Sequence, residues 1–299
     1  MLLIISISFA VIYSVLILPF MMRFTFQSRI RRKNYKGVHI PCTSGLAFSV
    51  YIVLICGFLI LYNSVTYRLQ PFTIDILSVL SGILSASYTG FIDDIEGDES
   101  HKGIKGHVSA LLKLEFTSGV IKASTGFIIA FIISFSWDLG LAESILNGFI
   151  ICLMQNFINL LDLRPGRAVK TYGVLLFLSL LFAALKPVFS CVCISTFIVL
   201  LFYLHYELNE KCMMGDTGSN TLGILLGIAI ASSLGYAYKI IILIFLMGIS
   251  VFPILLSPTI ILPSSKVARR TRCSKVLGTT FPLMAKTLLV CLMASSKLP

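Results

Sequence analysis

The feature that most constrains the fold is a series of apolar runs, each about 20 residues long, that follow one another along nearly the whole chain. A helix of about 20 apolar residues crosses a hydrocarbon core of roughly 30 Å with its backbone hydrogen bonds made internally. The 299 residues are 57% hydrophobic, whereas soluble domains contain about 45–50% apolar residues. The sequence therefore predicts an all-α integral membrane protein.

About ten transmembrane helices are expected, forming a single polytopic domain over residues 1–299. Very short turns join the spans that meet near Trp137, Lys186 and Tyr236. At each of these turns, the alternative to two helices is one bent span. The predicted spans are 2–22, 44–62, 73–92, 115–136, 139–156, 171–186, 188–206, 219–235, 237–262 and 277–295.

The distribution of Lys and Arg predicts the orientation, because positive residues in short loops stay on the cytoplasmic side. Basic residues follow the first, third, fifth, seventh and ninth spans, whereas the alternate loops hold few. Both termini are therefore expected to be extracytoplasmic. The net charge of +11 then concentrates on the cytoplasmic face, where it meets anionic head groups and phosphorylated ligands.

Two other uses of these residues are not favoured. The basic residues are spread over short loops, without the separate domain or aromatic platform of a nucleic-acid binder, so we expect no nucleic-acid partner. The eight cysteines form no Cys-x-x-Cys pair, which argues against a zinc site or a redox motif. We expect them to be free thiols.

Three polar, acidic stretches interrupt the apolar sequence, and all of them fall on the predicted cytoplasmic side. They are GFIDDIEGDES at 90–100, QNFINLLDLRPGRAVK at 155–170 and MMGDTGSN at 213–220. The first closes the third span, the second closes the fifth span, and the last opens the eighth. Three distant parts of the chain therefore bring carboxylates to one membrane face.

The first stretch contains two adjacent acids, Asp93 and Asp94. On a helix their side chains diverge by about 100°, so we expect a division of roles in which one contacts a cation and the other accepts a proton. The alternative is a pair of solvated charges at a helix end. The dipole of a helix disfavours acids at its C-terminus, which weakens that alternative.

In the second stretch Asn156, Asn159 and Asp162 follow at intervals of three residues, so consecutive members are neighbours along a helix. For the asparagines, the alternative is hydrogen bonding to other helices. Arg164 and Arg167 follow on a tight turn, and two guanidiniums beside a carboxylate suit a phosphate or diphosphate. Retention of positive charge in the cytoplasm would also explain these arginines.

In the third stretch Asp216 lies between two glycines, ahead of a helix start expected at about Ser219. A carboxylate at this place can bind Mg²⁺, while the N-terminal N–H groups of the helix face phosphate oxygens. Helix capping is the alternative for Asp216 taken alone. Considered with the other two stretches, Asp216 predicts a magnesium site.

In order, spacing and sidedness, GFIDD, NFINLLD and MMGDTGSN resemble the signature loops of the polyprenyl-phosphate sugar-1-phosphate transferases, glycosyltransferase family 4. This family includes phospho-N-acetylmuramoyl-pentapeptide transferase and N-acetylglucosamine-1-phosphate transferases. The resemblance implies Mg²⁺-dependent transfer of a sugar-1-phosphate from a nucleotide sugar, of UDP-N-acetylhexosamine type, to polyprenyl (undecaprenyl) phosphate with release of UMP. It also implies cell-envelope synthesis at a bacterial plasma membrane.

The resemblance implies residue roles as well. Lys36 and Ser44 match the first cytoplasmic loop of the family, and Lys113 and Lys122 match basic residues of its fourth helix. Lys122 falls inside a predicted span, where a lysine usually needs a carboxylate or phosphate partner. The full set comprises catalytic residues Asp93, Asp94 and Asp162; substrate-binding residues Lys36, Ser44, Lys113, Lys122, Asn156, Asn159, Arg164, Arg167, Arg269 and Arg270; and metal ligands Asp216, Asp93 and Asn159.

Two departures from the family pattern bear on the substrate. Where many members have a second acid after Asp162, this chain has LRPGR, and Arg269 and Arg270 occupy a loop that carries a histidine cluster in most members. The alternatives are a branch that acts on another nucleotide sugar, a catalytically silent relative, and a transporter or lipid-handling protein that binds phosphorylated ligands. The sequence also leaves open whether the chain acts alone or as a homodimer.

Overall fold

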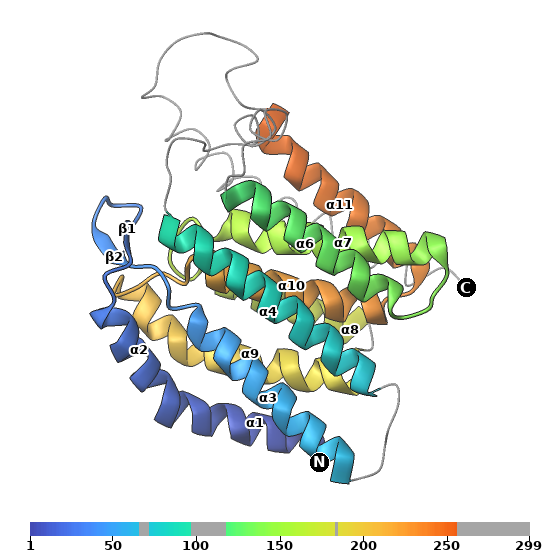
Figure 1. Ribbon diagram of the computed structural model, residues 1–299, viewed down its shortest axis with the longest axis horizontal. Helices are drawn as coiled ribbons and strands as arrows, with labels where there is room; N and C mark the ends of the chain where they lie inside the picture. The colour runs from blue at the N-terminus through green and yellow to red at the C-terminus, as the bar shows by residue number, and fades with distance from the viewer. Residues whose placement is uncertain (66–71, 97–117, 183–184, 256–299) are drawn as a thin grey trace.

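The computed structural model describes residues 1–65, 72–96, 118–182 and 185–255, which form a helical bundle with a β-hairpin at one end (Figure 1). The first helical stretch runs without a break through α1 (Leu2–Ile12), the π-helical turn η1 (Tyr13–Ile17) and α2 (Leu18–Gln27). The other helices are α3 (Leu46–Val65), α4 (Phe72–Glu96), α6 (Ser118–Phe135), α7 (Leu141–Leu161), α8 (Arg167–Phe182), α9 (Pro187–Leu208), α10 (Gly215–Ser233) and α11 (Tyr236–Leu255).

As far as the structure describes them, nine of the ten predicted spans overlap with these helices, and the tenth, 277–295, lies outside the described residues. Within the described part, five stretches are long and apolar enough to cross a membrane. They are Leu2–Gln27, Leu46–Val65, Phe72–Glu96, Leu141–Leu161 and Pro187–Leu208. The structure is thus that of a helical membrane protein, while the count of ten spans and the direction of insertion stay predictions.

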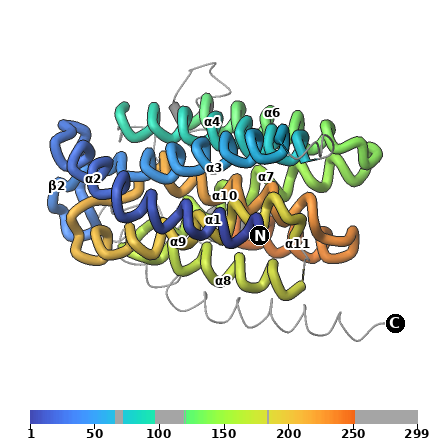
Figure 2. The backbone as a smooth tube through the Cα atoms, turned by 90° about the horizontal axis from the view of Figure 1, so that it is seen from below, coloured from blue at the N-terminus to red at the C-terminus, as the bar shows by residue number. Residues whose placement is uncertain are grey.

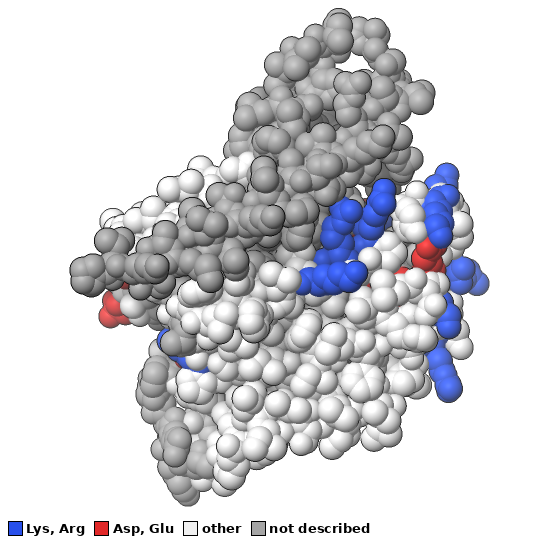
Figure 3. Space-filling model, turned by 180° about the vertical axis from the view of Figure 1, so that it is seen from behind, with Lys and Arg blue, Asp and Glu red and all other residues white. Residues whose placement is uncertain are grey.

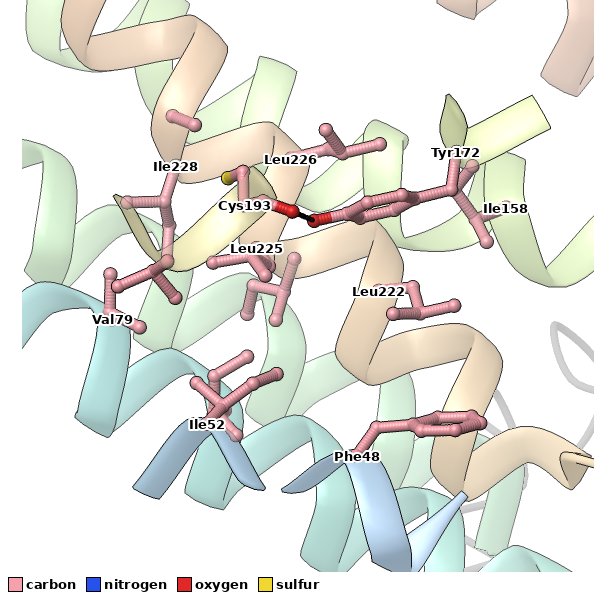
Figure 4. Packing of buried hydrophobic residues seen from close by; sticks show 14 of the residues in the cluster. Phe48, Ile52, Val79, Ile158, Tyr172, Cys193, Leu222, Leu225, Leu226 and Ile228 are labelled. Atoms are coloured by element: carbon pink, nitrogen blue, oxygen red, sulfur yellow. Dashed lines mark hydrogen bonds between the residues drawn. The ribbon is translucent and has the colours of Figure 1, made fainter. Parts of the chain in front are cut away.

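Helix α10 is the centre of the bundle. Every residue from Thr217 to Ala231 is buried, as expected of a helix that is apolar on all sides and surrounded by others. It packs against α3, α4, α7, α8 and α9 (Figure 2). Figure 4 shows its side chains among those of its neighbours, where the Tyr172 hydroxyl donates a hydrogen bond to the carbonyl of Cys193 at 3.1 Å. The core around α10 therefore fixes how the surrounding helix ends meet.

Two glycines one turn apart allow α10 to lie close to α7. A Cβ atom on Gly223 would lie 2.6 Å from the Cα of Gln155, and one on Gly227 would lie 2.9 Å from the Cα of Ile151. Small residues at this spacing let the backbones of membrane helices approach closely. The two helices that carry the second and third motifs are thereby held together.

The outer surface of the bundle is apolar on its flanks and basic at one end. Leu16, Leu84 and Phe177 are each more than half exposed, as side chains that face lipid would be. Lys and Arg gather on the side that carries the hairpin (Figure 3). At the other end, Lys186 and Lys239 are paired with acids, at 3.0 Å from Asp75 and 2.6 Å from Glu143. Among the described residues, Lys and Arg are therefore more numerous at the hairpin end, which is the end predicted to face the cytoplasm.

The hairpin consists of β1 (Arg31–Lys33) and β2 (His39–Pro41), which pair antiparallel with Arg32 opposite Ile40. The side chain of Asn34 accepts hydrogen bonds from the N–H groups of Lys36 and Val38 at 2.9 Å and so shapes the turn. Among the described residues the six cysteines are free, which confirms that expectation for this part of the chain.

Candidate active site

The three motifs meet at the hairpin end of the bundle, where the C-terminal ends of α4 and α7 lie beside the N-terminal ends of α6 and α10 (Figure 1). These helices run in alternating directions, so segments far apart in sequence end at the same level. The prediction that the three polar stretches meet at one end of the bundle is therefore confirmed. That this end faces the cytoplasm stays a prediction.

An ionic centre lies between these helix ends. The Lys122 ammonium on α6 contacts the Asp216 carboxylate on α10, and it lies 3.8 Å from the Asp93 carboxylate on α4. The Asn159 amide on α7 donates a hydrogen bond to Asp216 at 3.4 Å. The side chains of Lys122 and Asp216 are 17% and 27% exposed, so a ligand can reach them from outside. The expectation that Lys122 has a carboxylate or phosphate partner is met by the Asp216 carboxylate.

Asp94 has a different task from its neighbour. Its carboxylate accepts hydrogen bonds from the backbone N–H groups of Asp216 and Thr217, at 2.9 and 3.0 Å, and from the Thr217 hydroxyl at 2.6 Å. The first N–H groups of a helix have no partner within it, and an acid at this end is also favoured by the helix dipole. Asp94 therefore caps α10, which leaves Asp93 as the member of the pair that faces the open side.

Helix α10 begins at Gly215, four residues earlier than the expected start at Ser219. Asp216 consequently lies in the first turn of the helix. Its side chain is not the cap, because the Asp94 carboxylate accepts the hydrogen bond from its N–H group. The earlier start has a clear cause, because the partner that satisfies the first N–H groups comes from α4. A cap supplied by a residue 122 positions away cannot be read from the local sequence.

Glycines make this arrangement sterically possible. A Cβ atom on Gly90 would lie 2.5 Å from the carbonyl oxygen of Asp216, and one on Gly45 would lie 2.1 Å from the nitrogen of Gly218. Gly215 has a φ of +70°, which side chains rarely permit. Of the two glycines that flank Asp216, Gly218 allows close backbone contact with Gly45, and Gly215 allows the turn before the helix.

Asp162 directly follows the last residue of α7 and lies close to a buried acid, Glu207 of α9. Burial is the main cause that raises the pKa of Asp162 well above its usual value, and the charge of Glu207 adds to it. Glu207 accepts a hydrogen bond from the N–H group of Gly166 at 3.1 Å and so holds the turn of LRPGR. The structure places Asp162 near the ionic centre, but the contacts described for the centre come from other residues.

The remaining predicted residues are distributed over the hairpin end. Ser44 is buried and donates a hydrogen bond to the carbonyl of Met213, so it joins the first loop to the third motif. Lys36 is exposed at the hairpin turn and pairs with Glu210. The Arg164 guanidinium lies 5.7 Å from the centre of the Tyr35 ring.

Asn156 is exposed on α7, and Arg167 is half-buried where α8 begins. Lys113, Arg269 and Arg270 lie outside the described residues.

Two residues that the sequence did not single out contribute to this end of the bundle. Glu207 is an acid at the C-terminus of a predicted span, where the dipole disfavours it, and the same argument that drew attention to Asp93 could have found it. Arg32 was one of many basic residues in the first loop, but its guanidinium contacts the end of α4. Only the fold distinguishes Arg32 from the other basic residues of this loop, because only the fold shows its contact with α4.

The centre has the donors that a magnesium ion requires. Among the residues that the structure describes, no group of three or more His, Cys, Asp or Glu side chains forms a metal site. Mg²⁺ is usually held by one or two carboxylates, with water and substrate phosphates as its other ligands. The carboxylates of Asp93 and Asp216 both lie at the Lys122 ammonium, and Asn159 supplies an amide. These residues fit an ion whose other ligands come from substrate and water.

Fold and site together define a helical membrane protein with a charged, ligand-accessible centre at one end of its bundle. The family model for glycosyl transferase family 4 matches residues 76–234, from α4 to the end of α10, and the chain belongs to this family. Membership indicates an enzyme that transfers a phospho-sugar to polyprenyl phosphate. No curated protein matches the chain. The matched range contains the ionic centre and all three motifs, and it excludes the hairpin.

Proposed function

We propose that the protein transfers a sugar-1-phosphate from a nucleotide sugar of UDP-N-acetylhexosamine type to polyprenyl phosphate, at the cytoplasmic face of a bacterial plasma membrane. The observation that carries the proposal is the contact of Lys122 with Asp216 beside Asp93 and Asn159. These groups come from four helices of a protein in glycosyl transferase family 4. An interfacial site of this kind suits one substrate that arrives from water and another that arrives from the bilayer.

In the proposed reaction, an oxygen of the lipid phosphate attacks the phosphorus that carries the sugar. A new P–O bond forms to the lipid phosphate, and the bond between the two phosphates of the nucleotide sugar breaks. The products are a polyprenyl-diphosphate sugar and a nucleoside monophosphate, which is UMP for a UDP-sugar. Because the nucleophile belongs to the substrate, the protein contributes positioning and charge neutralisation.

The residues of the centre divide this work. Asp93 and Asp216 would hold Mg²⁺ together with Asn159, and the ion would neutralise the charge that develops on the diphosphate oxygens. Lys122 supplies a second positive charge at the same point. We assign Asp94 a structural part in this division, because both of its oxygens accept hydrogen bonds from α10. We assign binding of the diphosphate to Arg164, on the turn after Asp162, because a guanidinium can form two parallel hydrogen bonds to phosphate oxygens.

A purified-protein assay tests the proposal. The protein in detergent or nanodiscs is given undecaprenyl phosphate, Mg²⁺ and a panel of nucleotide sugars, and the release of nucleoside monophosphate is measured. We expect release with at least one UDP-N-acetylhexosamine, loss of release in EDTA and recovery when Mg²⁺ is restored. Absence of release with every nucleotide sugar would identify a catalytically silent member of the family.

Replacement of Lys122 by methionine tests the link between the lysine and the metal. The change removes the cation that contacts Asp216 and leaves two carboxylates close together, so a divalent ion should bind more readily. We expect the half-saturating Mg²⁺ concentration to fall, and the maximal rate to fall about 100-fold because a phosphate-binding charge is lost.

The matched control for this test is Lys170→Met, which removes an exposed basic residue from α8. Its rate and its Mg²⁺ dependence should equal those of the wild type. A Lys122→Met protein with unaltered Mg²⁺ dependence would show that the lysine and the ion do not share a site.

A further inference from the structure

The last turn of α4 is held by a residue of the hairpin. The Nε atom of Arg32 donates a hydrogen bond to the carbonyl of Asp94 at 3.3 Å, and its Nη2 atom donates one to the carbonyl of Asp93. The last four carbonyls of a helix have no partner within it, and cationic side chains are favourable at that end. α4 ends at Glu96, so both carbonyls belong to this set. Arg32 therefore caps α4 at the two residues that carry the acidic pair.

The capped turn is also the turn that holds α10. The carboxylate of Asp94 binds the first N–H groups of α10, and the second residue of that helix is Asp216. A continuous series of contacts thus runs from the guanidinium of Arg32, through the backbone of α4 and the side chain of Asp94, to the residue that contacts Lys122. A shift of the α4 end would displace both acids of the centre at once.

The hairpin is itself fixed to the segment that precedes α10. The N–H group of Met213 donates a hydrogen bond to the carbonyl of Pro41 at 2.8 Å, and the hydroxyl of Tyr35 donates one to Glu210 at 2.7 Å. The strand that carries Arg32 is paired with the strand that ends at Pro41. Arg32 is therefore mounted on an element whose position relative to α10 is set by other contacts.

We propose that Arg32 is a positioning residue of the active site. It binds the backbone of α4 and thereby fixes Asp93 and Asp94 relative to Asp216, without itself touching substrate. The effect of Arg32 on turnover rests on the proposed function, because it can be measured only if the protein catalyses the proposed transfer. It also assigns a task to the hairpin, which lies outside the range matched by the family model.

The test compares Arg32→Ala and Arg32→Lys with Lys33→Ala, which removes an exposed charge from the same strand. We expect kcat of Arg32→Ala to fall about 10- to 100-fold, because small misplacements of catalytic groups have effects of this size. KM for both substrates should stay within about twofold, since the residue binds backbone and not ligand. Arg32→Lys should recover part of the rate, because an ammonium can bind one carbonyl without the fork of a guanidinium.

Hydrogen exchange provides a readout that does not depend on turnover. In Arg32→Ala, the amides of the first turn of α10 and of the last turn of α4 should exchange faster than in the wild type and in Lys33→Ala. Equal exchange in all three proteins would overturn the inference, as would a rise in KM as the main kinetic effect. If the wild type turns over no nucleotide sugar, the proposed function fails, and hydrogen exchange alone still decides whether Arg32 holds the two helix ends.

Discussion

Replacement of Asp216 by asparagine is expected to lower turnover about 1,000-fold or more, because the change removes the carboxylate that we propose as a metal ligand and the negative charge opposite Lys122. The fold should survive. The bond that caps α10 uses the backbone N–H group of Asp216, at 2.9 Å from Asp94, and this group is unchanged by the substitution. The amide also has nearly the same shape as the carboxylate. A loss of activity would therefore reflect the missing carboxylate and not a loss of the fold.

The measurement is the initial rate of nucleoside monophosphate release, with the melting temperature of the same preparation beside it. Asp138→Asn is the matched control, since it makes the same chemical change in an exposed turn between α6 and α7. Asp138 has a φ of 52°, a conformation that asparagine also adopts. A normal rate for Asp216→Asn would reject the metal-binding role.

Replacement of Gly45 by alanine is expected to have the largest effect on folding. The new Cβ atom would lie 2.1 Å from the nitrogen and 2.3 Å from the Cα of Gly218, and 2.6 Å from the carbonyl oxygen of Met214. All three are backbone atoms of the segment that carries Asp216, so no side chain can move aside. We expect a loss of at least about 3 kcal/mol in the free energy of unfolding, together with loss of activity.

Gly57→Ala on the adjoining helix α3 is the control, because its new Cβ atom would meet no atom within 4 Å beyond the nearby backbone of its own helix. Alanine is preferred to glycine within a helix by roughly 0.5–1 kcal/mol, so this variant should be as stable as the wild type or more so. Thermal unfolding in detergent compares the two. Similar melting temperatures for both variants would mean that the first loop and the third motif are not in close backbone contact.

Much of the helical architecture follows from the sequence, because the bilayer imposes a local rule. A membrane helix satisfies its backbone hydrogen bonds within about 20 consecutive residues, so its place is visible in a short window of sequence. This is why the spans expected at 73–92 and 188–206 correspond to Phe72–Glu96 and Pro187–Leu208. The boundary that was wrong, at the start of α10, depends on a partner from another helix.

The sequence by itself determined which residue types the site contains and the face on which they gather, because charged groups are excluded from hydrocarbon and must collect where helices end. Only the tertiary structure decided what each acid does. It joined Lys122 to Asp216, used Asp94 to cap α10, and brought Arg32 to the end of α4. The physical reason is that hydrogen bonds are short-range, and these partners become neighbours only after the helices have packed around α10.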